Sequence, residues 1–186
     1  DDLRELWLVT RDAGIKLHMD GARIWNASVA SGVSYADYAR YSDSLSVCFS
    51  KGLGAPVGSM IISSRETIDL ARRYRKIFGG GMRQAGILAA AAEYALVNNL
   101  PKLGEDHEKA RIFTAELEKS GKLAPVPGSV ETNMVIFDVS ATGGSRDDFL
   151  TLLASVGVLL TPERENDVRA VMHLDVTMED AATAAK

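Results

Sequence analysis

The amino-acid sequence predicts an α/β protein, with a mostly parallel sheet in residues 1–100 and a small α+β lobe in residues 101–186. Helical and β-type hydrophobic patterns alternate along the first part, and this alternation is typical of a parallel sheet. In the second part, a long helical segment and a stretch rich in glycine and proline precede short strands that alternate with short helices. This change of pattern predicts a domain boundary between residues 98 and 105.

Hydrophobic spacing predicts each element of the first part. Leu3, Leu6 and Trp7 recur at helical spacing before Gly14, and glycine is a common helix stop. The link over residues 50–56 is too short for a parallel crossover, so the strand after it should return antiparallel. In order, we expect a helix over 2–13, a strand over 15–20, a polar helical stretch over 26–40, strands over 46–49 and 57–62, a helix over 66–77 and an alanine-rich helix over 86–97, buried or in contact with another subunit.

The second part carries one arginine in an otherwise apolar strand. Its expected elements are a solvated helix over 101–119, a strand over 134–139, a helix over 147–155, strands over 158–161 and 168–174, and a helix from 177. Arg169 alternates with apolar residues in the last of these strands. A buried arginine needs an anionic partner, so Arg169 belongs either to a salt bridge or to a site for a carboxylate ligand.

Lys51 is the candidate for a reactive residue. It follows the apolar run at 46–49 and Ser50, and a loop with Gly52, Gly54 and Gly58 comes next. A lysine held at the end of a buried strand by such a turn is fixed in position and partly dehydrated, so its amine can attack a carbonyl group. The simpler interpretation is a solvated lysine in a turn.

Two nucleotide-binding patterns do not fit this loop. A phosphate-binding loop, GxxxxGK[ST], places the lysine after its glycines and before a helix, whereas Lys51 precedes its glycines and a strand follows. The dinucleotide pattern GxGxxG also opens a helix, whereas residues 52–58 read GxGxxxG.

Charged residues occur at two further positions that favour ligand binding. Asp20 and Arg23 lie at the carboxyl end of the expected strand 15–20, the edge where open α/β sheets bind ligands, although the two could simply pair with each other. The triplet 79–81 is expected to open the alanine-rich helix, with Arg83 beside it. Free N–H groups at a helix start bind anions, but the triplet also fits a helix end followed by a flexible link.

The composition argues against several classes of partner and site. A net charge of −4, spread over helices of mixed sign, leaves no basic face for nucleic acid, and no apolar run approaches the length of a membrane span. Cys48, the single cysteine, excludes an internal disulfide and fits a reducing, cytoplasmic compartment. His18, His107 and His173 lack the spacing of metal ligands, so no metal site is expected.

Four segments, taken together and in order, resemble the low-specificity threonine aldolases, a family of fold-type-I pyridoxal-phosphate enzymes. They are HMDGAR at 18–23, SKGLGAPVGS at 50–59, RKIFGGGMRQAG at 75–86 and RAVMHLDV at 169–176. The resemblance implies that residues 1–100 are part of the large cofactor-binding domain of this fold type. Residues 101–186 would then be its small C-terminal α+β domain.

The resemblance also implies which residues bind pyridoxal 5′-phosphate. Lys51 would form the Schiff base with the cofactor, next to Ser50 in the same motif. Asp20 would pair with the protonated pyridine nitrogen and keep the ring cationic. Arg83 would reach the cofactor phosphate across a subunit interface, in a homodimer or homotetramer with its active sites at the interface.

The implied reaction is retro-aldol cleavage of a β-hydroxy-α-amino acid, such as threonine or allo-threonine, to glycine and an aldehyde. Arg23 would lie near the cofactor and the substrate carboxylate, and Arg169 would bind that carboxylate. An aminotransferase, a racemase or a β-eliminating lyase would use the same lysine and aspartate. The family's catalytic base, ring-stacking residue and phosphate loop lie in upstream sequence, so this chain is expected to be an inactive fragment when alone.

Overall fold

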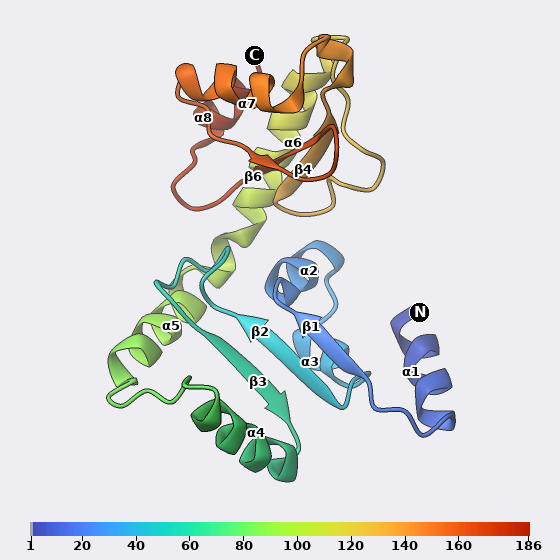
Figure 1. Ribbon diagram of the computed structural model, residues 1–186, viewed down its shortest axis with the longest axis vertical. Helices are drawn as coiled ribbons and strands as arrows, with labels where there is room; N and C mark the ends of the chain where they lie inside the picture. The colour runs from blue at the N-terminus through green and yellow to red at the C-terminus, as the bar shows by residue number, and fades with distance from the viewer. Residues whose placement is uncertain (1) are drawn as a thin grey trace. The chain divides into compact units, whose positions relative to one another are not determined.

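The computed structural model describes residues 2–186, and the chain divides into two compact units, Asp1–Pro101 and Lys102–Lys186. Each unit contains a three-stranded sheet with helices beside it (Figure 1). Within the described residues, no helix is both long and apolar enough to cross a membrane.

The sheet of the first unit has the order β1-β2-β3 and consists of β1 (His18–Gly21), β2 (Ser44–Cys48) and β3 (Ser59–Ser63). β1 and β2 are parallel, and β3 returns antiparallel to β2, which confirms the prediction from the short link. Leu45 and Val47 are buried on one face of β2, while Ser44 and Ser46 alternate with them on the other. The side chains of the polar face are therefore partly exposed.

Over the described residues of this unit, the α-helices are α1 (Asp2–Asp12), α2 (Ile24–Ser31), α3 (Tyr35–Ala39), α4 (Arg65–Ile77) and α5 (Gly86–Asn98). The single helical stretch expected over 26–40 is wrong, because Gly32 adopts a left-handed φ of 72° and ends α2. The Ser34 side chain then accepts a hydrogen bond from the Asp37 N–H and starts a separate helix.

Asp43 fixes the start of β1 relative to the start of β2. One of its carboxylate oxygens accepts from Lys16 Nζ at 2.8 Å and the other from the Leu17 N–H at 2.9 Å. These hydrogen bonds, with that of Lys16 first, lower the pKa of Asp43 below its ordinary value. The carboxylate thus sets the register that brings Asp20 opposite Ser46.

Gly21, at the end of β1, has no room for a side chain. A Cβ there would lie 2.5 Å from Leu45 Cδ1 and 2.9 Å from the Ser46 carbonyl oxygen. Gly21→Ala is therefore expected to lower the free energy of unfolding by about 1–3 kcal/mol, as measured by urea unfolding followed by circular dichroism. Gly86→Ala is the matched control, since a Cβ there meets nothing within 4 Å. Equal stability of the two variants would contradict the prediction.

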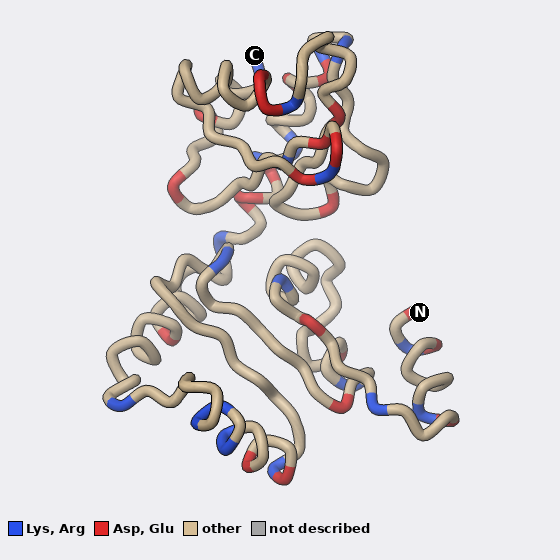
Figure 2. Tube along the Cα trace, in the orientation of Figure 1, with Lys and Arg blue, Asp and Glu red and all other residues tan. Residues whose placement is uncertain are grey.

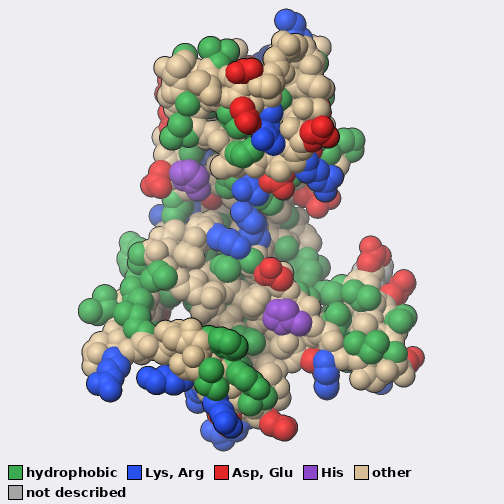
Figure 3. Space-filling view, in the orientation of Figure 1, with side chains coloured by type: hydrophobic (Ala, Val, Ile, Leu, Met, Phe, Trp, Pro, Cys, Tyr) green, Lys and Arg blue, Asp and Glu red, His purple; other side chains and the backbone are tan. Residues whose placement is uncertain are grey.

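In the first unit, α4 carries a row of basic residues and α5 exposes apolar side chains. Basic residues recur along α4, as the blue positions of that helix in Figure 2 show, and they include Arg72, Arg73, Arg75 and Lys76. The alanine-rich helix was expected to be buried or in contact with another subunit, yet within this chain Ala95 is its one buried residue. Ile87 is 82% exposed and Val97 70%, and hydrophobic side chains gather over α5 in Figure 3.

The second unit is built on an antiparallel sheet of order β4-β6-β5, with β4 (Met134–Asp138), β5 (Thr161–Pro162) and β6 (Asp167–Val171). Its helices are α6 (Leu103–Glu118), α7 (Arg146–Ser155) and α8 (Met178–Ala184), with a 3-10 turn at Ser140–Thr142; a second 3-10 turn, at Leu100–Lys102, lies where the two units meet in the sequence. Phe113 of α6 packs with Phe137, Val168 and Ala170 of the sheet and with Ala181 of α8 in one core. The strand expected over 158–161 overlaps β5 at Thr161 alone, and the strand expected over 168–174 already ends at Val171.

The prediction that the 101–119 helix is solvated is wrong. Asp106, His107 and Lys109 of α6 are buried. Lys109 Nζ donates to Asp106 Oδ1 at 2.8 Å and to the His173 carbonyl at 3.1 Å, so the buried charges are paired. Burial also lowers the pKa of His107. Polar residues alone do not indicate exposure, because a paired charge can enter the core.

Candidate functional site

Asp20 presents a carboxylate at the carboxyl end of β1. Its Oδ1 accepts from the Ala22 N–H at 3.1 Å and from Ser46 Oγ at 3.4 Å. Among the residues that the structure describes, Oδ2 has no hydrogen-bond partner. Asp20 is exposed, so one oriented carboxylate oxygen is available to a ligand.

Arg23 does not neutralise this carboxylate. It is half-buried at the start of α2, and no ion pair joins it to Asp20 in the described part of the chain. The alternative that Asp20 and Arg23 serve as a structural pair is therefore not supported. Both charges at this end of β1 remain available to a ligand.

The loop that carries Lys51 is closed by its own backbone hydrogen bonds. The Gly54 N–H donates to the Lys51 carbonyl at 2.8 Å, the Ala55 N–H to Phe49 at 3.1 Å and the Phe49 N–H to Gly58 at 3.0 Å. Gly54 has a φ of 72° and Gly58 a φ of 129°, which side-chain-bearing residues rarely adopt. The main chain at Lys51 is therefore fixed three residues beyond the end of β2.

The expected partial dehydration of Lys51 is wrong for this chain, because the loop turns Leu53 and Ala55 into the core rather than Lys51. Lys51 and the neighbouring Ser50 are exposed. Lys51 makes no ion pair within the described residues, so its amine is accessible to a ligand.

Two side chains that the sequence motifs did not single out hold this region in place. Trp25 Nε1 donates to the Cys48 carbonyl at 3.0 Å, and its ring stacks on Phe49 with centroids 6.4 Å apart. Asn99 Nδ2 donates to the Leu53 carbonyl at 2.8 Å. Neither contact was predictable by spacing, since the partners are 23 and 46 residues apart. The one feature of the sequence that could have indicated a role for Trp25 is its position two residues after Arg23.

Arg83 is exposed in an irregular stretch, not at a helix start. α5 begins at Gly86, so the glycine triplet at 79–81 does not open it as predicted. Gly79 instead has a left-handed φ of 80° directly after α4, which supports the interpretation as a helix end. No hydrogen bond or ion pair links Arg83 to Asp20 or Lys51 within the described residues.

Arg169 lies on β6 in the second unit, where Val168 and Ala170 face the core and Arg169 is half-buried on the other face. Its Nη1 is 2.9 Å from Glu163 Oε2. Its Nε is buried and has no hydrogen-bond partner. Arg169 therefore forms the predicted salt bridge but retains a donor that is not used.

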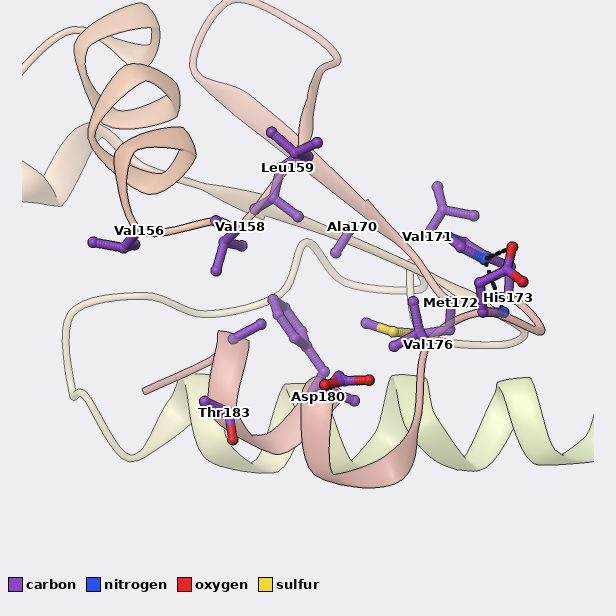
Figure 4. A pocket seen from close by; sticks show the side chains of 16 residues that line it. Val156, Val158, Leu159, Ala170, Val171, Met172, His173, Val176, Asp180 and Thr183 are labelled. Carbon is purple, nitrogen blue, oxygen red and sulfur yellow. Dashed lines mark hydrogen bonds and ion pairs between the residues drawn. The ribbon is translucent and has the colours of Figure 1, made fainter.

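Two cavities have linings that include neither Asp20 nor Lys51. One, of about 910 Å³, lies between β3 and α4 and is lined by Ser46, Ile61 and Arg75 among others. The other, of about 420 Å³, lies in the second unit between β6, α8 and the segment before β5 (Figure 4). Its lining is mostly apolar, with His173 paired to Asp175 at 3.6 Å near one end. Apart from Ser46, which contacts Asp20, these cavities contain none of the site residues considered above. Over the described residues, no cluster of side chains suits a metal ion.

Relatives of known sequence match almost the whole chain. The low-specificity L-threonine aldolase of Escherichia coli (strain K12) is 43% identical over 183 residues, which cover 98% of this chain and 53% of the relative. The low-specificity L-threonine aldolase 1 of Arabidopsis thaliana is 43% identical over 175 residues, 92% of this chain and 48% of the relative. These matches confirm the resemblance. The chain spans about half the length of the curated relatives it matches.

Solved structures confirm the fold. A putative L-allo-threonine aldolase from Listeria monocytogenes EGD-E superposes with a TM-score of 0.79 at 21% identity, over 99% of this chain and 52% of that one. A putative aromatic amino acid β-eliminating lyase/threonine aldolase from Exiguobacterium sp. 255-15 gives 0.77 at 21% identity, over 98% and 55%. The fold is therefore that of fold-type-I enzymes. The family model for the β-eliminating lyases matches residues 1–141, and the chain therefore belongs to this family.

Proposed function

We propose that the protein containing this chain uses pyridoxal 5′-phosphate to cleave a β-hydroxy-α-amino acid, such as threonine or allo-threonine, to glycine and an aldehyde. The observation that carries the proposal is the placement of Asp20 and Lys51 at the same edge of the sheet. These residues lie at the carboxyl ends of two neighbouring parallel strands, in a chain 43% identical to threonine aldolases. An acid and an amine at one sheet edge are what this cofactor requires.

The residues present fit the cofactor. Asp20 has one carboxylate oxygen held by Ala22 and Ser46, while the other has no partner among the described residues and can accept from a pyridine N–H. Lys51 supplies an accessible amine on a fixed loop, and Ser50 beside it supplies a hydroxyl group. These are the donor and acceptor types needed for a phosphorylated pyridine aldehyde.

Each residue then has a separate task. Asp20 holds the proton at the pyridine nitrogen, and Lys51 holds the cofactor covalently. Once bound, pyridoxal phosphate supplies an electron sink for the pair left on Cα when the Cα–Cβ bond breaks. Trp25 and Asn99 act on the backbone of the Lys51 loop, because they hydrogen-bond the Cys48 and Leu53 carbonyls.

The arginines are proposed to bind anions. Arg23 and Arg169 would bind the substrate carboxylate, and a fixed carboxylate orients the bond to be broken. Arg83 would bind the cofactor phosphate of a second copy. The exposed apolar side chains of α5 support a homodimer or homotetramer, and the single Cys48 fits a cytoplasmic location.

The assay that tests the reaction measures all products from allo-threonine in the full-length protein loaded with pyridoxal phosphate. Retro-aldol cleavage releases glycine and acetaldehyde in equal amounts. A β-elimination would instead release ammonia and a keto acid, and transamination would consume an added keto acid. Ammonia without glycine would contradict the proposal and favour β-elimination, the reaction after which the matching family is named.

Arg169→Lys tests the carboxylate contact. A lysine keeps the charge but cannot offer the planar pair of donors, so the KM for allo-threonine should rise about 10-fold or more. Steady-state kinetics of the full-length protein measure this change. Arg164→Lys, in the exposed turn before β6, is the matched control. Unchanged kinetics of Arg169→Lys together with reduced thermal stability would show that Arg169 serves only a salt bridge.

A further inference from the structure

Arg169 already pairs with a carboxylate of its own chain. Its Nη1 lies 2.9 Å from Glu163 Oε2. Thr161 of β5 is paired with Arg169 of β6, and Glu163 follows two residues later. Glu163 therefore lies diagonally across from Arg169 on the same face of the sheet, at a distance that long side chains bridge.

The turn that presents Glu163 is anchored at two points. The Glu163 N–H donates to the Asp167 carbonyl at 3.0 Å, which closes the hairpin. The next carbonyl, that of Arg164, accepts from Arg146 Nη1 of α7 at 2.7 Å. The carboxylate is consequently held near Arg169 by the fold and not by the chance position of a flexible loop.

Another carboxylate can nevertheless replace Glu163 at Arg169. The two side chains are 32% and 31% exposed, and no hydrogen bond of normal geometry joins them within the described residues. Arg169 Nε also has no partner among these residues, but it is buried, so the exchange concerns the partly exposed end of the guanidinium group. A carboxylate that accepts two parallel bonds from a guanidinium group binds better than a single exposed ion pair.

We infer that Glu163 is a specificity-determining residue that competes with the substrate carboxylate for Arg169. This inference rests on the proposed function of Arg169. In the absence of substrate, Glu163 occupies the anion position of the guanidinium group. An amino acid must displace it, so Glu163 raises the concentration at which amino acids bind. Analogues with a neutral amide in place of the carboxylate interact too weakly with the Arg169 guanidinium group to displace Glu163, so they are rejected.

The test is Glu163→Gln in the full-length protein loaded with pyridoxal phosphate. Glutamine keeps the shape and an acceptor but removes the competing charge. The dissociation constant of glycine, measured by calorimetry, and the KM for allo-threonine should each fall about five-fold, the most that an ion pair of this exposure is expected to contribute. The value of kcat should change less than about two-fold, because the charge acts on binding.

Glu165→Gln is the matched control, because Glu165 lies in the same turn, is exposed and makes no ion pair within the described residues. Equal tightening in both variants, or unchanged or weaker glycine binding in Glu163→Gln, would overturn the inference. In an Arg169→Gln background, Glu163→Gln should have no further effect. If Arg169→Gln alone leaves glycine binding unchanged, the proposed role of Arg169 fails as well. If Arg169→Gln weakens glycine binding but Glu163→Gln in the otherwise unaltered protein has no effect, only the inference about Glu163 is overturned.

Discussion

Lys51→Ala is expected to lower turnover of allo-threonine by roughly 10³-fold or more, because it removes the amine proposed to hold the cofactor covalently. The fixed loop makes this expectation specific. The backbone around Lys51 is closed by hydrogen bonds from Gly54, Ala55 and Phe49, so no neighbouring side chain can take its place without breaking them. Glycine release by the full-length protein with added pyridoxal phosphate measures the loss.

A second measurement identifies the lysine directly. Borohydride reduction of the loaded protein, followed by peptide mapping, should place the pyridoxyl group on Lys51. Lys16 is the internal comparison, since its amine is engaged by Asp43 at 2.8 Å. Lys122→Ala, in an exposed turn of the second unit, should retain full turnover. A pyridoxyl group on Lys16 or Lys76, or full activity of Lys51→Ala, would show that the assignment is wrong.

Asp20→Asn is expected to lower turnover about 100-fold while the protein keeps most of its cofactor. Asparagine has the shape of aspartate and can still accept from the Ala22 N–H and Ser46 Oγ, so the end of β1 should keep its structure. The change removes only the negative charge that would hold a proton at the pyridine nitrogen. Turnover and cofactor content of the same preparation, by kinetics and absorbance, separate these effects.

Asp12→Asn is the matched control for the change of charge, since Asp12 is exposed at the end of α1. It should leave turnover within about two-fold of the unaltered protein. If Asp20→Asn loses only a few-fold in turnover, Asp20 serves the structure of the sheet edge. Loss of the cofactor along with the activity would instead indicate that the carboxylate acts in binding.

The fold of the first unit was largely predictable because its signals are local. The antiparallel return of β3 followed from the short link after Ser50, and the parallel pairing of β1 with β2 followed from the α-β-α-β order. Errors occurred where a glycine ended a helix earlier than the polar pattern indicated, as at Gly32. They also occurred at 79–81, where the glycines follow one helix without opening the next.

The α/β fold, the family, and the placement of Asp20 and Lys51 at strand ends could be read from the amino-acid sequence, because these depend on periodicity and on motifs of a few adjacent residues. Which groups surround Asp20 and Lys51 became known from the packing of the folded chain. Trp25 reaches Cys48, Asn99 reaches Leu53, and Lys109 and Asp106 enter the core together. Glu163 reaches Arg169 because a hairpin register brings the two side chains to one face. Such contacts depend on how distant segments pack and on whether a charged side chain is paired with an opposite charge. Neither produces a periodic pattern in the sequence.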